Sequence, residues 1–324
     1  MDIDAVITWV DGADPVHRER MARYGGASDF SRDDVAGSTR YSSVGEIFWC
    51  VASINRFAPF IRKIYIITDG QDPRLDGFLE RNFPEGYIPV EIVDHRTVFR
   101  DYEEYLPVFN SLAIESVMWR IPGLSEHFIY FNDDIMLTAP VTPEDFFSPD
   151  GNGIVSYSDR RSVFLTDISR RWKTLLHRGE RQVTFKGMLR NSVSVLGGGG
   201  FYYLHYRHTP RALLKSWFDE FFAAHPEAVI RNIGHRFRNP VQFCPEAVQV
   251  LGLYRSGRCE LRPPEKNLFF FQLKDRPGYL DRKLERFVRG GFLFCCFNSL
   301  DKLNGDDMKR VVSLIEERLS ICQQ

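Results

Sequence analysis

The sequence predicts an α/β fold, with a mostly parallel sheet flanked by helices and a helical C-terminal part. Strand and helix signals alternate over the first 140 of the 324 residues, which is the pattern of parallel strands joined by helical crossovers. The strand candidates are β-branched or aromatic and almost continuously apolar, as strands buried on both faces are. A hydrophobic content of 44% is enough to fill one large core.

The elements of the first half follow one another in a regular order. Strands are predicted at residues 5–10, 63–68, 90–93 and 128–131. A helix is predicted at 44–57, because Ile47, Val51 and Ile54 fall on one face and the run from Ser43 to Glu46 fits a capping box. A second helix should span 111–120 and end before Pro122.

The second half has fewer strand signals. Residues 159–190 carry nine Lys/Arg against three Asp/Glu, which fits either a solvated basic surface or a binding surface for phosphate groups. The glycines at 197–200 lack the spacing of a phosphate-binding loop and are interpreted as a flexible connection. Helices are expected to dominate after Pro210, and the last, at 306–322, has an apolar stripe of core type. We treat 1–324 as one domain, with an α/β half at 1–150 and a mainly helical half at 151–324.

Composition limits the possible partners and compartments. A formal net charge of −1 gives no global field for nucleic acid, so an anionic ligand must be held by a local cluster. We expect no signal peptide and no membrane-spanning helix, because the chain has neither a cationic start nor an apolar run of about 20 residues. The six cysteines are scattered and suggest a reduced, cytoplasmic protein, at most peripheral to the inner face of the membrane.

Acidic or amide side chains follow each of the four predicted strands. Asp11, Asp69 and Asp94 follow the first three, and Asn132, Asp133 and Asp134 follow the fourth. In open α/β sheets ligands bind beyond the carboxyl ends of the strands, so these residues should surround one crevice. Adjacent carboxylates there suit Mg²⁺ or Mn²⁺ bridging phosphates, although an Asp that caps the following turn explains the same pattern.

Ten longer motifs stand in order along the chain. They are Ile3 to Pro15, Arg40-Tyr41, Ile64 to Gln71, Ile92 to His95, Phe109 to Ser111, Arg120 to Ser125, Phe128 to Asp134, His208 to Pro210, His235 to Arg238 and Phe294 to Asn298. These motifs resemble the Stealth family, which includes bacterial capsular polysaccharide phosphotransferases and the animal enzyme that phosphorylates mannose glycans of lysosomal hydrolases. The resemblance is dense over residues 1–140 and patchy beyond.

Two positions depart from the family pattern, namely Ser299, where the family commonly has Asp, and Ser43-Val44, where members often carry Asp-Asn. The resemblance implies that 1–324 is a single catalytic domain, in which the α/β half at 1–150 binds the nucleotide-sugar and the mainly helical half at 151–324 completes the site.

The resemblance implies a GT-A-like or Rossmann-like fold and a definite reaction. A hexose-1-phosphate, with GlcNAc-1-phosphate as the first candidate, would pass from a UDP-sugar to a hydroxyl of a growing polysaccharide or oligosaccharide, and UMP would leave. The setting implied is capsule or surface polysaccharide synthesis in bacteria. The cofactor implied is Mg²⁺ or Mn²⁺.

Candidate site residues combine this resemblance with side-chain chemistry. Asp133 and Asp134 are candidates for base and metal ligand, with Asn298 as a further ligand; His208 is a candidate proton carrier and Arg238 a phosphate clamp. A structural histidine and a surface basic residue are the plainer interpretations of the last two. The candidates for binding substrate are Asp11, Asp14, Arg40, Glu46, His95, Asn110, Asn191 and His235; for Asp11, Asp14 and Glu46 a turn-stabilising or helix-capping role explains the residue as well.

Three functions remain open at this stage. The first is a sugar-1-phosphate transferase, the second a GT-A-like metal-dependent glycosyltransferase that releases UDP, and the third a non-catalytic carbohydrate-binding relative. The joint presence of Asp133, Asp134, His208 and Arg238 disfavours the third, because a binding module has no need of the whole set. The first two differ in the leaving group, and only the resemblance separates them.

Overall fold

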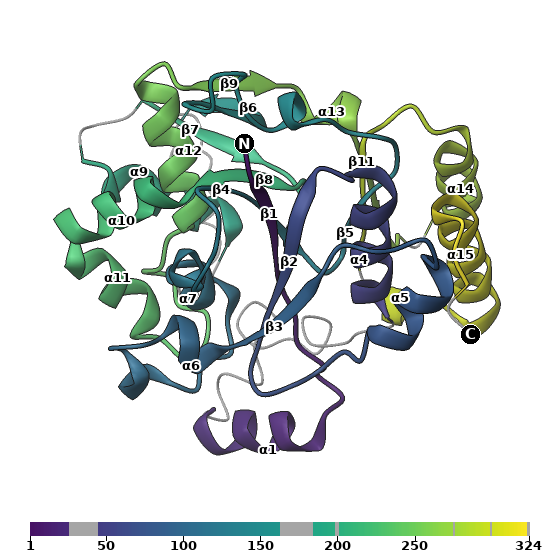
Figure 1. The fold of residues 1–324 in the computed structure, drawn as a ribbon, viewed down its shortest axis with the longest axis horizontal. Helices are drawn as coiled ribbons and strands as arrows, with labels where there is room; N and C mark the ends of the chain where they lie inside the picture. The colour runs from purple at the N-terminus through teal and green to yellow at the C-terminus, as the bar shows by residue number, and fades with distance from the viewer. Residues whose placement is uncertain (26–44, 163–183, 198–200, 275, 299, 323–324) are drawn as a thin grey trace.

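A five-stranded sheet forms the centre of the computed structural model (Figure 1). Its strand order is β3 (Val90–Asp94), β2 (Ile61–Thr68), β1 (Ile3–Thr8), β4 (His127–Asn132) and β8 (Arg211–Leu214). The first four strands are parallel and β8 is antiparallel to β4, so the predicted mostly parallel sheet is confirmed. The structure describes residues 1–25, 45–162, 184–197, 201–274, 276–298 and 300–322.

Both faces of this sheet are buried, as the continuous apolar strands require. Ala5 and Ile7 of β1 belong to one core cluster, whereas Val6 between them belongs to the other, because successive side chains point to opposite faces. In Figure 1 helices cover both sides of the sheet. One side has α4 (Glu46–Phe57) and α5 (Asp76–Asn82); the other has α6 (His95–Val98), α7 (Ser111–Glu115), α10 (Lys215–Ala224) and α11 (Pro226–Ile233).

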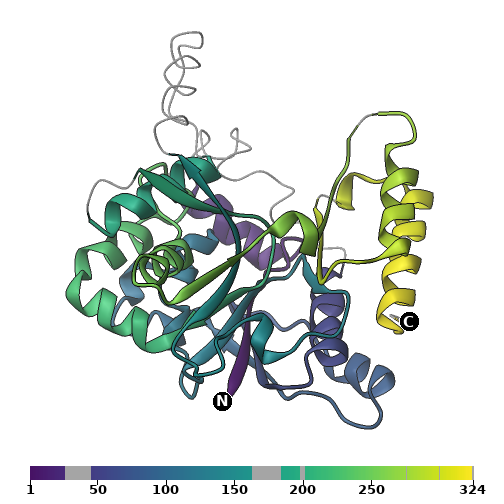
Figure 2. The ribbon, with the colours of Figure 1, turned by 90° about the horizontal axis from the view of Figure 1, so that it is seen from above.

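A small C-terminal layer packs beside α4. It contains the sheet β10 (Leu268–Gln272), β11 (Phe294–Asn298) and β5 (Ile135–Leu137), in which β11 runs antiparallel to β5. The helices α14 (Tyr279–Arg289) and α15 (Gly305–Leu319) lie next to each other at the outer edge in Figures 1 and 2. Arg56 of α4 donates to the Leu319 carbonyl at 3.2 Å, which fastens this layer to the central unit.

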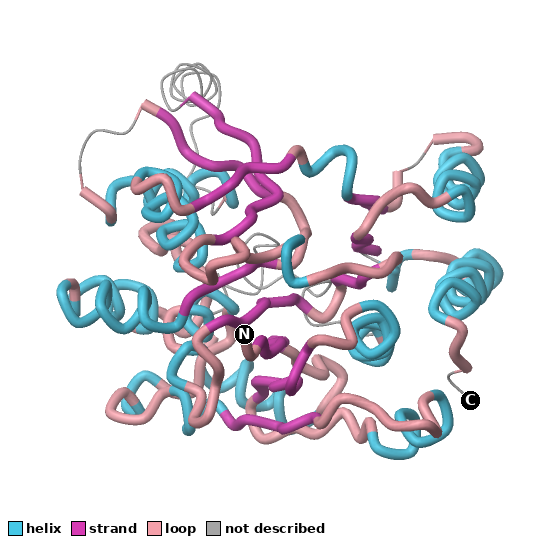
Figure 3. The backbone as a smooth tube through the Cα atoms, turned by 45° about the horizontal axis from the view of Figure 1, so that its top comes forward, coloured by secondary structure: helices cyan, strands magenta, loops and turns pink. Residues whose placement is uncertain are grey.

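A third sheet lies above the central one in Figures 1 and 3. Its order is β7 (Tyr202–Tyr206), β6 (Ile154–Ser162) and β9 (Cys259–Arg262), so strands as well as helices run through the second half of the chain. The remaining elements are α1 (Pro15–Tyr24), α9 (Phe185–Val195), α12 (Pro245–Arg255), α13 (Pro264–Asn267) and the 3₁₀ segments Glu103–Tyr105, Met118–Arg120, Pro143–Asp145 and Leu300–Lys302.

Two predicted helices differ from the structure in detail. Helix α4 begins at Glu46 with left-handed Gly45 as its N-cap and no side-chain capping bond, and Ser43 of the predicted capping box lies outside the described residues. The predicted helix at 111–120 is interrupted after Glu115. There the Ser116 hydroxyl donates to the Leu112 carbonyl at 2.7 Å, and the chain continues as a 3₁₀ turn.

Two further observations bear on the predictions from composition. All six cysteines lie in the described part of the chain and are free thiols. Within the described residues, every helix is too short or too polar to cross a lipid bilayer. The glycines at 198–200 and most of the basic segment, residues 163–183, lie outside the described residues.

Candidate active site

Polar side chains gather at the carboxyl edge of the central sheet. Strands β1 to β4 are parallel neighbours, so the residues that follow them emerge along the same edge. Two groups of side chains form there, one around Asp134 after β4 and one around Asp11 and Asp14 after β1. The sequence argument that a ligand crevice lies at the strand ends applies to both groups.

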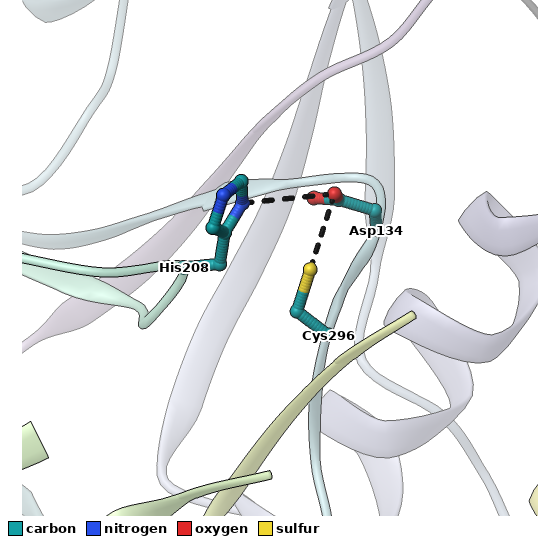
Figure 4. A group of neighbouring side chains, drawn as sticks. All are labelled: Asp134, His208 and Cys296. Carbon is teal, nitrogen blue, oxygen red and sulfur yellow. Dashed lines mark hydrogen bonds and ion pairs between the residues drawn. The ribbon is translucent and has the colours of Figure 1, made fainter. Parts of the chain in front are cut away.

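The first group brings together Asp134, His208 and Cys296 from three distant parts of the chain (Figure 4). His208 Nδ1 lies 3.8 Å from Asp134 Oδ2, and the Cys296 thiol donates to the same oxygen at 3.3 Å. The other oxygen, Asp134 Oδ1, is buried and has no hydrogen-bond partner within the described structure. One ligand atom from each residue lies within 4.8 Å of the other two.

Strand pairing explains why these three side chains meet. Cys296 in β11 is paired with Ile135 at the start of β5, which places its thiol beside the preceding Asp134. His208 lies in the short turn between β7 and β8, and its ring stacks on Phe270 of β10 with centroids 5.1 Å apart. The C-terminal layer therefore closes one side of the site.

The charges around the group set its protonation. Desolvation lowers the pKa of His208; Asp134 opposes this change, and Arg211 and Arg238 reinforce it. The imidazole is thus neutral at pH 7 and can accept a proton. The pKa of Asp133 is raised well above its usual range by desolvation, and then by the charges of Asp134 and Glu46. Glu46, predicted to bind substrate, thus lies near the acidic pair at the first turn of α4.

The group fits a divalent cation. For a four-coordinate ion such as Zn²⁺, metal–ligand bonds of about 2.0–2.3 Å place neighbouring ligand atoms roughly 3.3–3.5 Å apart. The separations of 3.3 and 3.8 Å around Asp134 Oδ2 are close to that spacing. Asn298 is two residues beyond Cys296 in β11 and so is on the same face of the strand, where an amide oxygen can add to the set. A donor set of O, N and S is softer than the all-oxygen set that Mg²⁺ prefers.

The second group consists of Asp11, Asp14 and Gln71. Gln71 Nε2 donates to the Asp11 carbonyl at 3.0 Å and to Asp14 Oδ2 at 2.9 Å, and its Oε1 accepts from the Asp11 amide at 2.9 Å. The pKa of Asp14 is lowered by this bond from Gln71 and by the Val16 amide that it caps. These bonds join the ends of β1 and β2 through one amide side chain.

Next to this group lies a buried histidine. His95 is 5% exposed, and neither ring nitrogen has a hydrogen-bond partner within the described structure. Burial lowers the pKa of His95 to about 4, against the opposing charges of Asp69 and Asp94. Asp69 accepts an ion-paired hydrogen bond from Arg20 at 3.0 Å. The strand-end carboxylates and His95 thus interact along the ends of β2 and β3.

Two of the predicted substrate-binding amides bond to the backbone. Asn110 Nδ2 donates to the His235 carbonyl at 2.7 Å and to the Arg236 carbonyl at 3.2 Å, while Asn191 Nδ2 donates to the carbonyls of Pro240 and Gln242. These bonds fasten the segment that carries Arg238 to α7 and α9.

Arg238 itself is held less firmly. One of its guanidinium nitrogens, Nη2, lies 3.4 Å from the Ser111 hydroxyl, and its charge acts on His208. The guanidinium is therefore a candidate to bind an anionic group of a substrate. The backbone carbonyl of His235 accepts one of the Asn110 hydrogen bonds that hold this segment in place.

Sequence reasoning missed several residues that the structure places at the site. Phe270 resembles an ordinary core residue in sequence. Gln71 and Cys296 lie in the motifs Ile64 to Gln71 and Phe294 to Asn298, but the sequence assigned neither of them a role. For Gln71 the available signal was its place just beyond a strand end. Arg40, a predicted substrate ligand, lies outside the described residues.

A separate hollow of about 540 Å³ lies far from these groups. It is lined by Ser148, Asp150, Arg258 and Glu260, among others. The adjoining Gly151 carbonyl bonds His127, which begins β4, whereas Asp134 follows the end of that strand. This hollow is therefore separate from the strand-end groups.

Comparison with known proteins identifies related sequences. Residues 1–29 match Stealth protein CR1, conserved region 1, and residues 40–155 match Stealth protein CR2, conserved region 2. The receptor polysaccharide phosphotransferase WefC of Streptococcus oralis is 33% identical over 260 residues, which is 74% of each chain. The capsular polysaccharide phosphotransferase WcwK of Streptococcus pneumoniae is 34% identical over the same shares.

A relative in another genus extends the match to almost the whole chain. The exopolysaccharide phosphotransferase SCO6023 of Streptomyces coelicolor is 32% identical over 98% of this chain and 50% of its own length. Among solved structures, the galactosyltransferase LgtC in complex with donor and acceptor sugar analogs aligns with a TM-score of 0.50 and 12% identity, over 100% of this chain and 97% of that chain. This likeness shows a GT-A-like fold.

Proposed function

Because the chain belongs to the Stealth family of polysaccharide phosphotransferases, we propose that it transfers a hexose-1-phosphate from a UDP-sugar to a carbohydrate hydroxyl and releases UMP. GlcNAc-1-phosphate is the group we expect to be transferred, in the synthesis of a bacterial capsule or surface polysaccharide. The observation that carries the proposal is the meeting of Asp134 and a neutral His208 at the strand ends, beside Arg238. These three side chains are the ones that we propose to carry the reaction.

The proposed reaction requires charge stabilisation and proton transfer at phosphorus. The acceptor oxygen attacks the β-phosphorus, the bond from that phosphorus to the bridging oxygen breaks, and UMP leaves. His208 Nδ1 accepts the proton of the attacking hydroxyl. Arg238 donates N–H groups to the non-bridging oxygens of the phosphate. Asp133, whose pKa is raised, is the second candidate for the base.

Of the group Asp134, His208 and Cys296, Asp134 and Cys296 would hold the divalent cation, with Asn298 as a further oxygen ligand, because Nδ1 of His208 is the proposed proton acceptor. A bound cation neutralises the charge of the diphosphate and stabilises the leaving phosphate. The orientation of the set comes from the protein, because β11 fixes Cys296 and Phe270 holds the plane of His208. We propose Mg²⁺ or Mn²⁺ as the working ion, with Mn²⁺ the better match to a set containing sulfur.

The uridine part of the donor is proposed to bind at the Asp11, Asp14 and Gln71 group. Carboxylates at strand ends are suited to accept hydrogen bonds from ribose hydroxyls. Arg40, Glu46 and His95 are proposed to complete this part of the crevice. Asn110, Asn191 and His235 would act indirectly, through the backbone bonds that support Arg238.

A second candidate function is glycosyl transfer with release of UDP. The likeness to the galactosyltransferase favours it, because the same fold and a metal at the diphosphate serve attack on the anomeric carbon. The two reactions differ in the bond that breaks. Sugar-phosphate transfer leaves UMP and a diester, whereas glycosyl transfer leaves UDP and a glycoside without phosphorus.

The distinguishing experiment is product identification. The protein is incubated with UDP-GlcNAc, other UDP-sugars and oligosaccharide acceptors, and the nucleotide and the modified acceptor are analysed. We expect UMP to accumulate one-for-one with a product that has a diester phosphorus resonance, and Asp134→Asn to suppress both. UDP as the sole nucleotide, with no phosphorus in the acceptor, would establish the glycosyltransferase instead.

A further inference from the structure

A buried network of charged and phenolic side chains lies beneath the acidic turn at residues 132–134. It contains Glu115, Glu246 and Arg211, together with Tyr130 and Tyr206, and no role followed for any of them from sequence. Glu115 is 4% exposed and Glu246 is 2% exposed. Burial of two carboxyl groups and a guanidinium has a high desolvation cost, so their arrangement needs a reason.

The guanidinium lies between the two tyrosines. Arg211 Cζ is 4.3 Å from the centre of the Tyr206 ring and 5.7 Å from that of Tyr130, and Arg211 Nε is 3.7 Å from Glu246 Oε1. Glu246 Oε1 also accepts from the Tyr206 hydroxyl at 2.8 Å. Glu246 is therefore the carboxylate that balances the buried Arg211 charge.

Glu115 is then left as the neutral member of the pair. Its pKa is raised well above the usual range by desolvation and by Glu246, although Arg211 and Arg238 act in the opposite direction. Two ionised carboxylates at such close range in a buried site are strongly disfavoured. A hydrogen bond between the two carboxyl groups is a further cause of this shift, so the proton of Glu115 is held between Glu115 and Glu246.

The hydrogen bonds around Tyr130 have a definite direction. The Tyr130 hydroxyl lies 2.7 Å from Asn132 Oδ1 and 3.2 Å from Glu115 Oε1, and both oxygens are placed to accept its proton. An amide oxygen can only accept, so the single phenolic proton points to Asn132, the nearer of the two. The phenolic oxygen is then available as an acceptor for the Thr8 hydroxyl, which is 2.9 Å away.

We propose that Tyr130 is a positioning residue for the acidic turn, acting through a directed chain of hydrogen bonds from Thr8 to Tyr130 and from Tyr130 to Asn132, with Glu115 as the buried neighbour of the Tyr130 hydroxyl. Asn132 is the last residue of β4 and directly precedes Asp133 and Asp134. The chain therefore orients the turn that presents both acids to the crevice. This inference rests on the proposed function only in its catalytic consequence, since the hydrogen bonds themselves belong to the free protein.

The test compares two buried tyrosines that each lose one hydroxyl. Tyr130→Phe breaks the chain at its centre, and Tyr206→Phe, the matched control, removes a hydroxyl on the other side of the carboxyl pair. Hydrogen exchange of peptides covering residues 128–137 is measured on the full chain without substrate. We expect Tyr130→Phe to accelerate exchange there about three- to tenfold, the effect of one lost hydrogen bond, and Tyr206→Phe to leave it unchanged.

Kinetics and a third variant complete the test. With donor and acceptor, Tyr130→Phe should lower kcat more than it raises KM, because the acids are displaced rather than removed. Glu115→Gln keeps the shape of the side chain beside the Tyr130 hydroxyl and leaves the chain from Thr8 to Asn132 intact, so it should retain wild-type exchange and kcat. The proposal is overturned if Tyr130→Phe and wild type exchange equally fast, or if both tyrosine variants accelerate exchange equally. It is also overturned if Glu115→Gln changes exchange and kcat as much as Tyr130→Phe does. Failure of the proposed function would instead appear as wild-type protein that forms no UMP.

Discussion

Burial of His95 makes a quantitative prediction about stability and pH. The folded protein holds the pKa of His95 at about 4, mainly because the buried ring is desolvated. In the unfolded chain a histidine titrates near 6.5. Between these values the unfolded state binds the extra proton, so the free energy of unfolding falls as the pH falls below 6.5 and this loss ends near pH 4. For a pKa shift of this size, lowering the pH from 7 to 5 should reduce the free energy of unfolding by about 2 kcal/mol.

Urea unfolding of wild type and His95→Leu at pH 7, 6 and 5 measures this contribution. Leucine removes the titrating group and keeps an apolar side chain of similar size, so the variant should lose about 2 kcal/mol less stability than wild type over that range. His225→Leu, at an exposed histidine, controls for the loss of a histidine at the surface. Parallel stability curves for wild type and His95→Leu would refute the assignment of a buried, neutral His95.

Four further predictions concern other residues of the site and the sheet. Asp134→Asn should lower kcat at least roughly a hundredfold in the presence of Mn²⁺, as removal of a group that acts on transition-state charge does. His208→Gln should lower kcat by a larger factor than it changes KM. It should also abolish the fall in rate at acid pH, which in wild type should lie below pH 6.5 because the pKa of His208 is lowered. Cys296→Ser should weaken Cd²⁺ or Zn²⁺ binding, measured by calorimetry, by more than about tenfold and leave Mg²⁺ binding nearly unchanged, because the thiolate is the soft ligand. Asp4→Ala should destabilise the fold by about 1–3 kcal/mol in urea unfolding, because it leaves the Ser125 amide without the buried carboxylate that it contacts at 2.7 Å, while the half-exposed Arg62, which contacts the same carboxylate at 2.7 Å, can turn to water.

Each of these predictions has a result that contradicts it. Full turnover of Asp134→Asn in excess EDTA would show that the reaction needs neither Asp134 nor a divalent cation. A fully active His208→Gln protein would make that histidine structural, and unchanged Cd²⁺ affinity in Cys296→Ser would place the cation elsewhere. A loss below about 1 kcal/mol in Asp4→Ala would show that the buried ion pair is worth no more than an exposed one.

The central sheet was predictable because its signals are local. Each of the first four strands is a continuous apolar run, and the structure places them within two residues of the predicted bounds. Strand β8 was not predicted, because its four residues are too few to show a period and it pairs antiparallel with β4 through contacts distant in sequence. The interruption at Ser116 was missed for a similar reason, since it depends on a side-chain bond to the Leu112 carbonyl.

The site was predictable where residue type and strand ends coincide. Asp133, Asp134 and Asp11 follow strands that are legible in the sequence, so their gathering at one edge follows from parallel order. Cys296 could not be placed, because its contact with Asp134 depends on the register of β11 against β5 across 162 positions. Glu115 and Glu246 look like exposed helix residues in sequence, and only their burial beside Arg211 reveals a network.

The fate of the donor's β-phosphorus tests the central claim most directly. UDP-GlcNAc labelled with ³²P at the β-position is incubated with the protein, Mn²⁺ and an oligosaccharide acceptor, and the label is followed into the separated products. The account predicts that the label enters the acceptor in a one-to-one ratio with the UMP formed, and that Asp134→Asn abolishes this transfer. Label that remains entirely in UDP while the acceptor gains unlabelled sugar would contradict it.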